Sequence, residues 1–126
     1  MPNGTGLDGM LLASRDPERL RAWYSAALEP QAESRENQYR MLDFRGFYLV
    51  IDHRDDVAAT NPDPARVVLN FDVEDARAAV KRIEQAGTRW IAPLEDRDGS
   101  LFATATDPDG NYVQVIQLSQ EHRNAM

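Results

Sequence analysis

The chain has 126 residues, 42% of them hydrophobic and 28% charged, and its formal net charge is −7. This length and composition predict one soluble globular domain, and the acidic balance argues against nucleic acid as a partner because it would repel phosphate backbones. Cysteine is absent, so the sequence offers no disulfide, thiolate metal site or cysteine nucleophile. It contains neither an apolar run of about 18 residues nor a signal-peptide pattern, so we expect a cytoplasmic location and no membrane partner.

The first half of the chain is predicted to form a strand, a helix and three further strands. The segment "GMLLAS" is typical of a short buried strand, and "RDPERLRAWYSAAL" of a helix. Asp16 is a good N-cap, Pro17 suits the first helical position, and an apolar face follows at helical spacing. We expect this face to pack in the core; it consists of Leu20, Trp23, Tyr24, Ala27 and Leu28. The three strands are expected at residues 31–35, 38–44 and 47–53, with Arg45-Gly46 as the link between the last two.

The second half repeats this order after a polar connector, "RDDVAATNPDPA". A strand is predicted over residues 65–73, and a helix over 74–87 in which Gly87 is the C-terminal cap. Three more strands are expected at residues 88–92, 101–106 and 111–118, with "PLEDRDGS" as a loop between the first two.

The two halves therefore form an internal repeat. Gly9 superposes on Val68 and Asp16 on Asp75, both at an offset of 59 residues. We predict an α+β fold of two βαβββ modules within one domain spanning residues 1–126. The modules are expected at about 7–54 and 65–118, and residues 1–6 and 119–126 are expected to be flexible tails.

Two motifs carry a family resemblance that extends from about Leu7 to Leu118. "TDPDGNYVQVIQ" and "RDPERLRAWYSAAL", together with the repeated modules, resemble the vicinal oxygen chelate superfamily of glyoxalases, bleomycin-resistance proteins, extradiol dioxygenases and fosfomycin-modifying enzymes. The resemblance implies that each module curls its sheet into half a barrel, that two modules form a cup, and that a small member such as this one pairs as a homodimer. A curved sheet with helices on one side leaves such a concave pocket on the other.

Alternation along the strands assigns side chains to the cup. In the strand after the connector, Val67, Leu69, Phe71 and Val73 should face the helix, and in the last strand Val113 and Val115 should do so. The opposite positions give a ligand-binding set with an aromatic lining and several polar groups. The predicted ligand-binding residues are Tyr48, Asp52, Arg66, Val68, Asn70, Trp90, Phe102, Tyr112 and Gln114.

The metal site of the superfamily's enzymes is expected to be missing. The resemblance places the four metal-ligand positions at Gly9, Val50, Val68 and Gln114. Three of these residues offer no donor atom, and a single amide oxygen cannot hold Mn, Fe, Ni or Zn against water. We therefore predict neither metal nor cofactor.

The other titratable residues have ordinary structural interpretations. His53 and His122 are expected to be solvated, and Asp107 and Asp109 to shape the turn before the last strand through hydrogen bonds to nearby amides. Arg66 has two open interpretations: an ion pair with a nearby carboxylate such as Asp52, or an anchor for a polar or anionic ligand group. No catalytic residue is assigned.

The sequence favours a metal-independent protein that binds a small molecule, a drug or a metabolite, over an enzyme. The alternative is a lyase, isomerase or dioxygenase-like enzyme of the superfamily with an atypical site, for which Arg66, Asp52 and Tyr112 are the candidate residues. A regulatory or interaction module is a third possibility. Because this fold serves many unrelated chemistries, the ligand is not specified.

Overall fold

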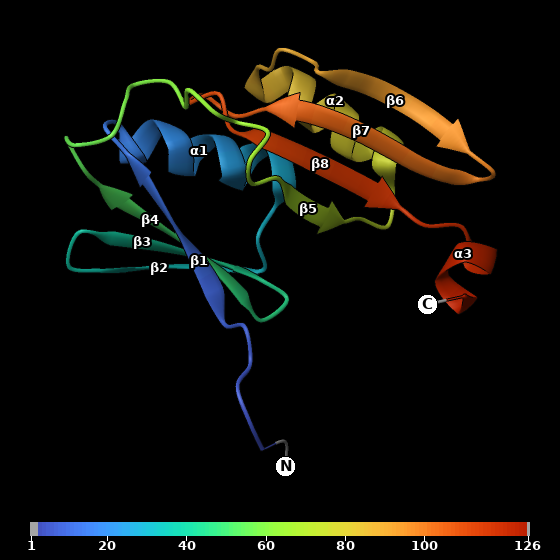
Figure 1. Ribbon diagram of the computed structural model, residues 1–126, viewed down its shortest axis with the longest axis horizontal. Coiled ribbons are helices and arrows are strands. Elements are labelled where there is room, and N and C mark those ends of the chain that lie inside the picture. Colours follow the sequence, from blue (N-terminus) through green and yellow to red (C-terminus); the bar gives the residue numbers. More distant parts are fainter. Residues whose placement is uncertain (1–2, 126) are drawn as a thin grey trace.

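The computed structural model describes residues 3–125 as two βαβββ modules followed by a short helix (Figure 1). The first module contains one helix and four strands: β1 (Gly9–Ser14), α1 (Pro17–Leu28), β2 (Ala32–Glu36), β3 (Tyr39–Phe44) and β4 (Phe47–His53). The second repeats that order as β5 (Leu69–Asp72), α2 (Ala76–Ala86), β6 (Ala92–Arg97), β7 (Ser100–Thr106) and β8 (Tyr112–Gln117), before α3 (Gln120–Asn124). The predicted α+β fold of two repeated modules is confirmed.

Each module has its own mixed sheet of four strands, and the two sheets are separate. The strand orders are β1-β4-β3-β2 and β5-β8-β7-β6. In both sheets the first and last strands of the module run parallel, and the remaining pairs are antiparallel. A parallel neighbour requires a crossover connection, which the helix provides. Strands β1 and β5 each have one unpaired edge and do not pair with each other.

The two helices begin with the same cap at equivalent positions of the repeat. The Asp16 side chain accepts a hydrogen bond from the Arg19 backbone N–H at 3.2 Å, and Asp75 accepts one from Ala78 at 3.1 Å. Such a cap satisfies one of the free amides in the first turn of a helix. The shared offset of 59 residues predicted from the sequence is therefore also a structural correspondence.

The core joins the two modules. The predicted apolar face of α1 is buried, and α1 packs directly against α2. Leu49 and Ile51 of β4, and Val113 and Val115 of β8, are also buried in the shared cluster. At the module boundary the rings of Phe44 and Phe71 meet edge to face with centroids 5.0 Å apart, a favourable aromatic geometry.

The strand predicted over residues 65–73 is shorter in the structure, because β5 contains only Leu69–Asp72. The backbone N–H of Arg66 bonds the carbonyl of Asp63 at 3.2 Å, which makes a turn of this segment. Strand β8 begins at Tyr112, and Leu69 is opposite Val113. The residues before Val68 consequently have no strand residue opposite them, and their β-branched character is not enough to extend the strand.

The strand predicted at 88–92 and the loop predicted after it are also corrected. Residues 88–91 form a connector, and β6 runs through the supposed loop as Ala92–Arg97. It ends in a two-residue turn in which Asp98 and Gly99 both have positive φ, 53° and 90°. An Asp-Gly pair is a strong hairpin signal for this reason, and here strands flank it on both sides.

The C-terminal segment, predicted as a flexible tail, includes the helix α3. Ser119 caps it by accepting from the His122 amide at 3.1 Å, and the ring of His122 makes a very short contact with the Ser100 hydroxyl. Arg123 forms an ion pair with Asp72 at 2.9 Å. These contacts hold the segment 119–125 against the second module. His122 is thus packed against Ser100 rather than solvated.

Candidate functional site

The side of each sheet that lies away from its helix is called here the open face of that sheet. Burial alternates along the strands as the sequence predicts: Leu49 and Ile51 are buried toward α1, whereas Tyr48 and Val50 are half-buried on the other side. In β8, Val113 and Val115 are buried toward α2, and Gln114 is half-buried on the open face. The predicted assignment of faces is confirmed in β4 and β8, whereas Val67, predicted to face the helix, lies before β5 and is 54% exposed.

The first open face, that of the β1–β4 sheet, is apolar and acidic. Leu11 and Met41 lie opposite Val50 on its two sides, and Leu11 is 52% exposed. The charged side chains that alternation places on this face are all acidic: Glu36, Asp43 and Asp52. The face therefore offers contacts for an apolar body and for a positive charge.

Asp52 differs from the other acidic residues of this face because it is buried. It is 7% exposed, and its Oδ1 atom has no hydrogen-bond partner among the described residues. Its neighbour across the pair with β1 is Ala13, which offers no polar group. A buried polar atom is normally hydrogen-bonded, so an unpaired carboxylate oxygen needs an explanation.

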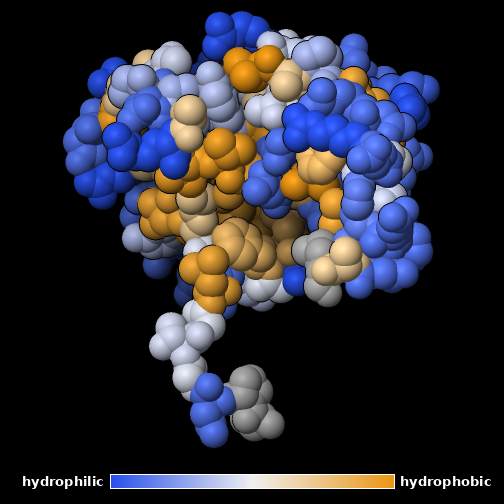
Figure 2. Space-filling model, turned by 45° about the vertical axis from the view of Figure 1, so that its right-hand side comes forward, coloured by the Kyte–Doolittle hydropathy of each residue, from blue (hydrophilic) through white to orange (hydrophobic). Residues whose placement is uncertain are grey.

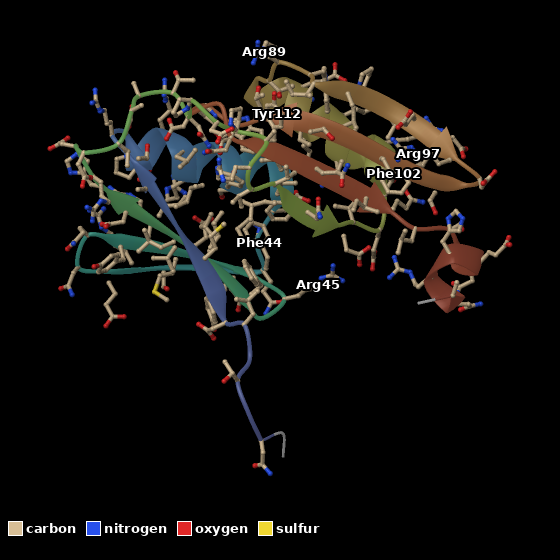
Figure 3. The ribbon with its side chains drawn as sticks, in the orientation of Figure 1. Phe44, Arg45, Arg89, Arg97, Phe102 and Tyr112 are labelled. Atoms are coloured by element: carbon tan, nitrogen blue, oxygen red, sulfur yellow. The ribbon has the colours of Figure 1, made fainter. Side chains whose placement is uncertain are left out.

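The second open face, that of the β5–β8 sheet, has a polar and aromatic lining. Asn70 lies opposite Gln114, and the Gln114 amide donates to the Thr104 hydroxyl at 3.4 Å. Arg97 lies over the ring of Phe102, with the guanidinium carbon 5.0 Å from the ring centroid (Figure 3). This geometry is that of a cation–π contact.

Two predicted ligand-binding residues lie away from the open faces. Arg66 is exposed in the turn before β5 and pairs with Asp63, Nε to Oδ2, at 2.8 Å. The interpretation that paired it with Asp52 is therefore wrong. Trp90 lies in the connector before β6 and packs against the core. The structure brings Tyr48 and Asp52 together on the first face, and Asn70, Phe102, Tyr112 and Gln114 on the second.

A cleft of about 710 Å³ opens between the modules. It is bounded by the end of α1, the β3–β4 turn, β5 and the start of the second helical segment. Phe44, Phe47 and Phe71 supply aromatic surface, and Val68 and Asn70 of the predicted set also line it. Figure 2 shows a hollowed apolar area in the middle of the molecule, above the N-terminal segment. At the β3–β4 turn, next to Phe44, Arg45 donates to the carboxylate of Asp72 at 3.1 Å (Figure 3).

The turn before β8 connects the modules through a buried hydrogen bond. The Tyr24 hydroxyl donates to Asp107 Oδ2 at 2.6 Å, and Asp107 Oδ1 accepts from the amides of Asp109 and Asn111 at 2.9 and 3.0 Å. The predicted turn-shaping role of Asp107 is confirmed, but its bond to Tyr24 was not predicted. Burial raises the pKa of Asp107, and these hydrogen bonds act against burial. Burial, with the nearby Asp107 charge, raises the pKa of Tyr24 well above its ordinary value.

A family model described as a glyoxalase-like domain matches residues 9–116, which is most of the chain. The chain belongs to this glyoxalase-like family. Its fold is also that of solved family structures. A glyoxalase/bleomycin resistance protein/dioxygenase family enzyme from Burkholderia phytofirmans has a TM-score of 0.75 at 18% identity, over 91% of this chain and 100% of that one. The fosfomycin resistance protein FosX from Mesorhizobium loti has a TM-score of 0.72 at 16% identity, over 98% and 99%.

One curated relative shares a higher identity over a shorter segment. A lactoylglutathione lyase from Pseudomonas aeruginosa is 41% identical over 49 residues, which are 39% of this chain. The match spans about a quarter of that protein, 27% of its length.

The four positions at which the resemblance to the superfamily places metal ligands do not hold residues that fit a divalent metal. Val50 and Val68 offer no donor, and Gln114 offers one amide. A side chain at Gly9 is excluded by the backbone, because a Cβ there would lie 2.2 Å from the carbonyl oxygen of Tyr48. Within residues 3–125, no three His, Cys, Asp or Glu side chains gather as a metal site elsewhere. Divalent metals need several such donors.

No helix among the described residues is long and apolar enough to cross a membrane.

Proposed function

We propose that this glyoxalase-like protein binds a small organic molecule on its open faces without a metal. The observation that carries the proposal is that Gly9, Val50 and Val68, which have no donor atoms, occupy three of the four positions at which the resemblance places metal ligands. The same faces keep aromatic and amide side chains. Concave surfaces lined by apolar groups and a few polar groups are the usual sites for small molecules. Sequestration of a drug or metabolite is a role that requires such a surface and no Lewis acid.

We further propose that the protein is a homodimer in which the open faces of two copies complete one cup. The two faces of a single chain belong to separate sheets, and the edges of β1 and β5 are unpaired. Leu11 on β1 and Val68 beside β5 are 52% and 37% exposed, and unpaired edges with apolar flanks favour association. The proposed location is the cytoplasm, in keeping with a sequence that has no cysteine to oxidise.

The proposal is tested by metal analysis together with ligand titration. Purified protein should contain less than stoichiometric Mn, Fe, Ni or Zn, and calorimetry against a panel of amphipathic antibiotics and metabolites should give binding that chelators do not abolish. Light scattering during gel filtration should give a mass of twice the chain's 14.2 kDa. Stoichiometric metal that is required for binding would refute the metal-independent function, and a monomer would refute the dimer.

An enzymatic function is the alternative, and the identity to a lactoylglutathione lyase over 49 residues favours testing it. Of the three candidate residues, Asp52 and Tyr112 lie on the open faces, whereas Arg66 lies in the turn before β5 and pairs with Asp63. An assay of lactoylglutathione turnover, with and without added Mn²⁺, Ni²⁺ or Zn²⁺, decides between the two functions. The binding proposal predicts no turnover above background in either condition. Turnover above background that Tyr112→Phe abolishes would establish the enzyme.

A further inference from the structure

Asp52 is a buried carboxylate whose Oδ1 has no partner within the described part of the chain. Hydrogen bonds or ion pairs to its carboxylate are also absent among residues 3–125, although twelve other ion pairs are formed. Holding an unpaired carboxylate oxygen out of water is unfavourable. A fold that retains one at a strand position on its binding face leaves a site for a counterion.

The cation on which the Asp52 charge acts through space, Arg54, is already engaged. Arg54, the residue that follows β4, donates to both carboxylate oxygens of Asp56, with Nε–Oδ1 and Nη2–Oδ2 distances of 2.8 and 2.5 Å. This hydrogen bonding to Asp56 raises the pKa of Arg54, and the charge of Asp52 adds a smaller contribution through space. Arg54 is therefore a neighbour of Asp52 but a partner of Asp56.

The surroundings of Asp52 on the open face combine an aromatic ring with an apolar surface. Arg40 is opposite Ile51 in the β3–β4 pair, so the adjacent Tyr39 comes opposite Asp52, and Glu36 comes opposite Tyr39 on β2. One cross-strand row thus contains Glu36, Tyr39 and Asp52. Val50, two residues before Asp52 on the same face, has Leu11 and Met41 as its neighbours.

A carboxylate beside an aromatic ring and an apolar surface is the combination that recognises an organic cation. The carboxylate accepts charge-assisted hydrogen bonds from an ammonium or guanidinium group, the ring face attracts the same charge, and the apolar side chains cover the attached carbon skeleton. All charged residues of this face are acidic, and the net charge of −7 adds a field that attracts cations.

We propose that the ligand of the open face is an amphipathic organic cation, an amine or guanidine on an apolar body, and that Asp52 is its counterion. This inference rests on the proposed binding function and specifies the class of ligand. It also assigns the unpaired carboxylate a role that packing alone does not provide.

The test uses two fluorescent probes that differ only in charge. Dansylcadaverine has a dansyl group on a five-carbon chain that ends in an ammonium, and N-pentyl dansylamide has the same chain without it. The unmodified protein should bind the cationic probe about tenfold more tightly than the neutral one, the ratio that one charge-assisted contact provides. This comparison needs no variant, so it does not depend on how a substitution affects folding.

The Asp52→Asn variant locates that selectivity, and Glu84→Gln is its matched control. Asn is close to Asp in size, and circular dichroism should show an unchanged fold. Asp52→Asn should weaken dansylcadaverine binding about tenfold and change N-pentyl dansylamide binding less than about twofold. Glu84→Gln removes one negative charge at an exposed position of α2, on the side of the sheets away from the open faces, and it should change both affinities less than about twofold.

Several results would overturn the inference. Equal binding of both probes would show that the site does not select a cation. Unchanged selectivity in Asp52→Asn would show that Asp52 is not the counterion. In both cases the protein would still bind small molecules. A weaker dimer in Asp52→Asn with unchanged probe selectivity assigns the counterion to a second copy of the chain. Binding of neither probe also refutes the inference, and calorimetry with the wider ligand panel then decides separately whether the proposed binding function holds.

Discussion

Asp107 in the second module and Asp52 in the first are both buried carboxylates, 4% and 7% exposed, but their surroundings differ. Asp107 accepts hydrogen bonds from the Tyr24 hydroxyl, the Asn111 amide side chain and two backbone amides. Asp52 Oδ1 accepts none within residues 3–125. A satisfied buried carboxylate stabilises the local structure, whereas an unsatisfied one destabilises it until a ligand or partner arrives. The comparison distinguishes a residue that holds the fold from one available for binding.

The largest expected effect is at Asp107. Asp107→Ala removes every acceptor of this cluster and should lower the free energy of unfolding by about 3 kcal/mol or more, because several buried donors lose their partner. Tyr24→Phe removes only the hydroxyl and should lower it by about 1–2 kcal/mol. Urea denaturation measures both changes. Equal stability of Asp107→Ala and the unmodified protein would show that the hydrogen bonds to Asp107 do not hold the turn.

A change of opposite sign is expected at Asp52. Asp52→Asn removes an unpaired buried charge, so we expect the ligand-free protein to gain about 1 kcal/mol in the free energy of unfolding. The same substitution should reduce cation binding. Asp52 would then lower the stability of the ligand-free protein and also provide the counterion for the ligand. Thermal unfolding at a fixed protein concentration measures this gain, with Glu84→Gln as the control. A loss of stability comparable to that of Asp107→Ala would contradict the distinction between the two carboxylates.

The smallest expected effect is at Glu18, an exposed carboxylate that provides a reference for the two buried ones. Hydrogen bonds from Arg21 and then Arg40 lower its pKa from 4.5 to about 2. Because the folded pKa is lowered, the stability that this network contributes is present above pH 4.5 and is lost as the pH falls toward 2. The side chain is 57% exposed, so the contribution should be below about 1 kcal/mol. Glu18→Gln should flatten the acid side of the stability profile between these pH values, and an unchanged profile would show that the network contributes nothing.

The sequence predicted the fold well because its signals were local. Asp16 and Asp75 cap helices whatever surrounds them, and strict alternation in "YVQVIQ" assigns its faces without knowledge of the neighbouring strands. The repeat offset of 59 residues then followed from the matching positions. The caps and the alternation each depend on residues that lie only a few positions apart in the sequence.

The errors arose where neighbours far along the chain decide the structure. Val67 and Val68 favour a strand, but β5 begins at Leu69, where it pairs with Val113 of β8. Trp90 was assigned to the cup because a strand was expected at residues 88–92, whereas β6 begins at Ala92. The bond between Tyr24 and Asp107 joins residues 83 positions apart, and the missing partner of Asp52 is a property of the assembled sheet. The Tyr24–Asp107 bond and the unpaired oxygen of Asp52 can be recognised only when the packing of segments far apart in the sequence is known.

The close approach at Gly9 also bears on how this protein could change over time. A Cβ at this position would lie 2.2 Å from the Tyr48 carbonyl oxygen, a backbone atom that cannot rotate away as a side chain can. A mutation to His or Glu at position 9 would have to separate β1 from β4 as well as supply a donor. A metal ligand at position 9 therefore cannot arise through a single substitution of Gly9 without a change in the backbone. The spacing of β1 and β4 would have to change first, so more than one substitution would be needed before a side chain fits at position 9.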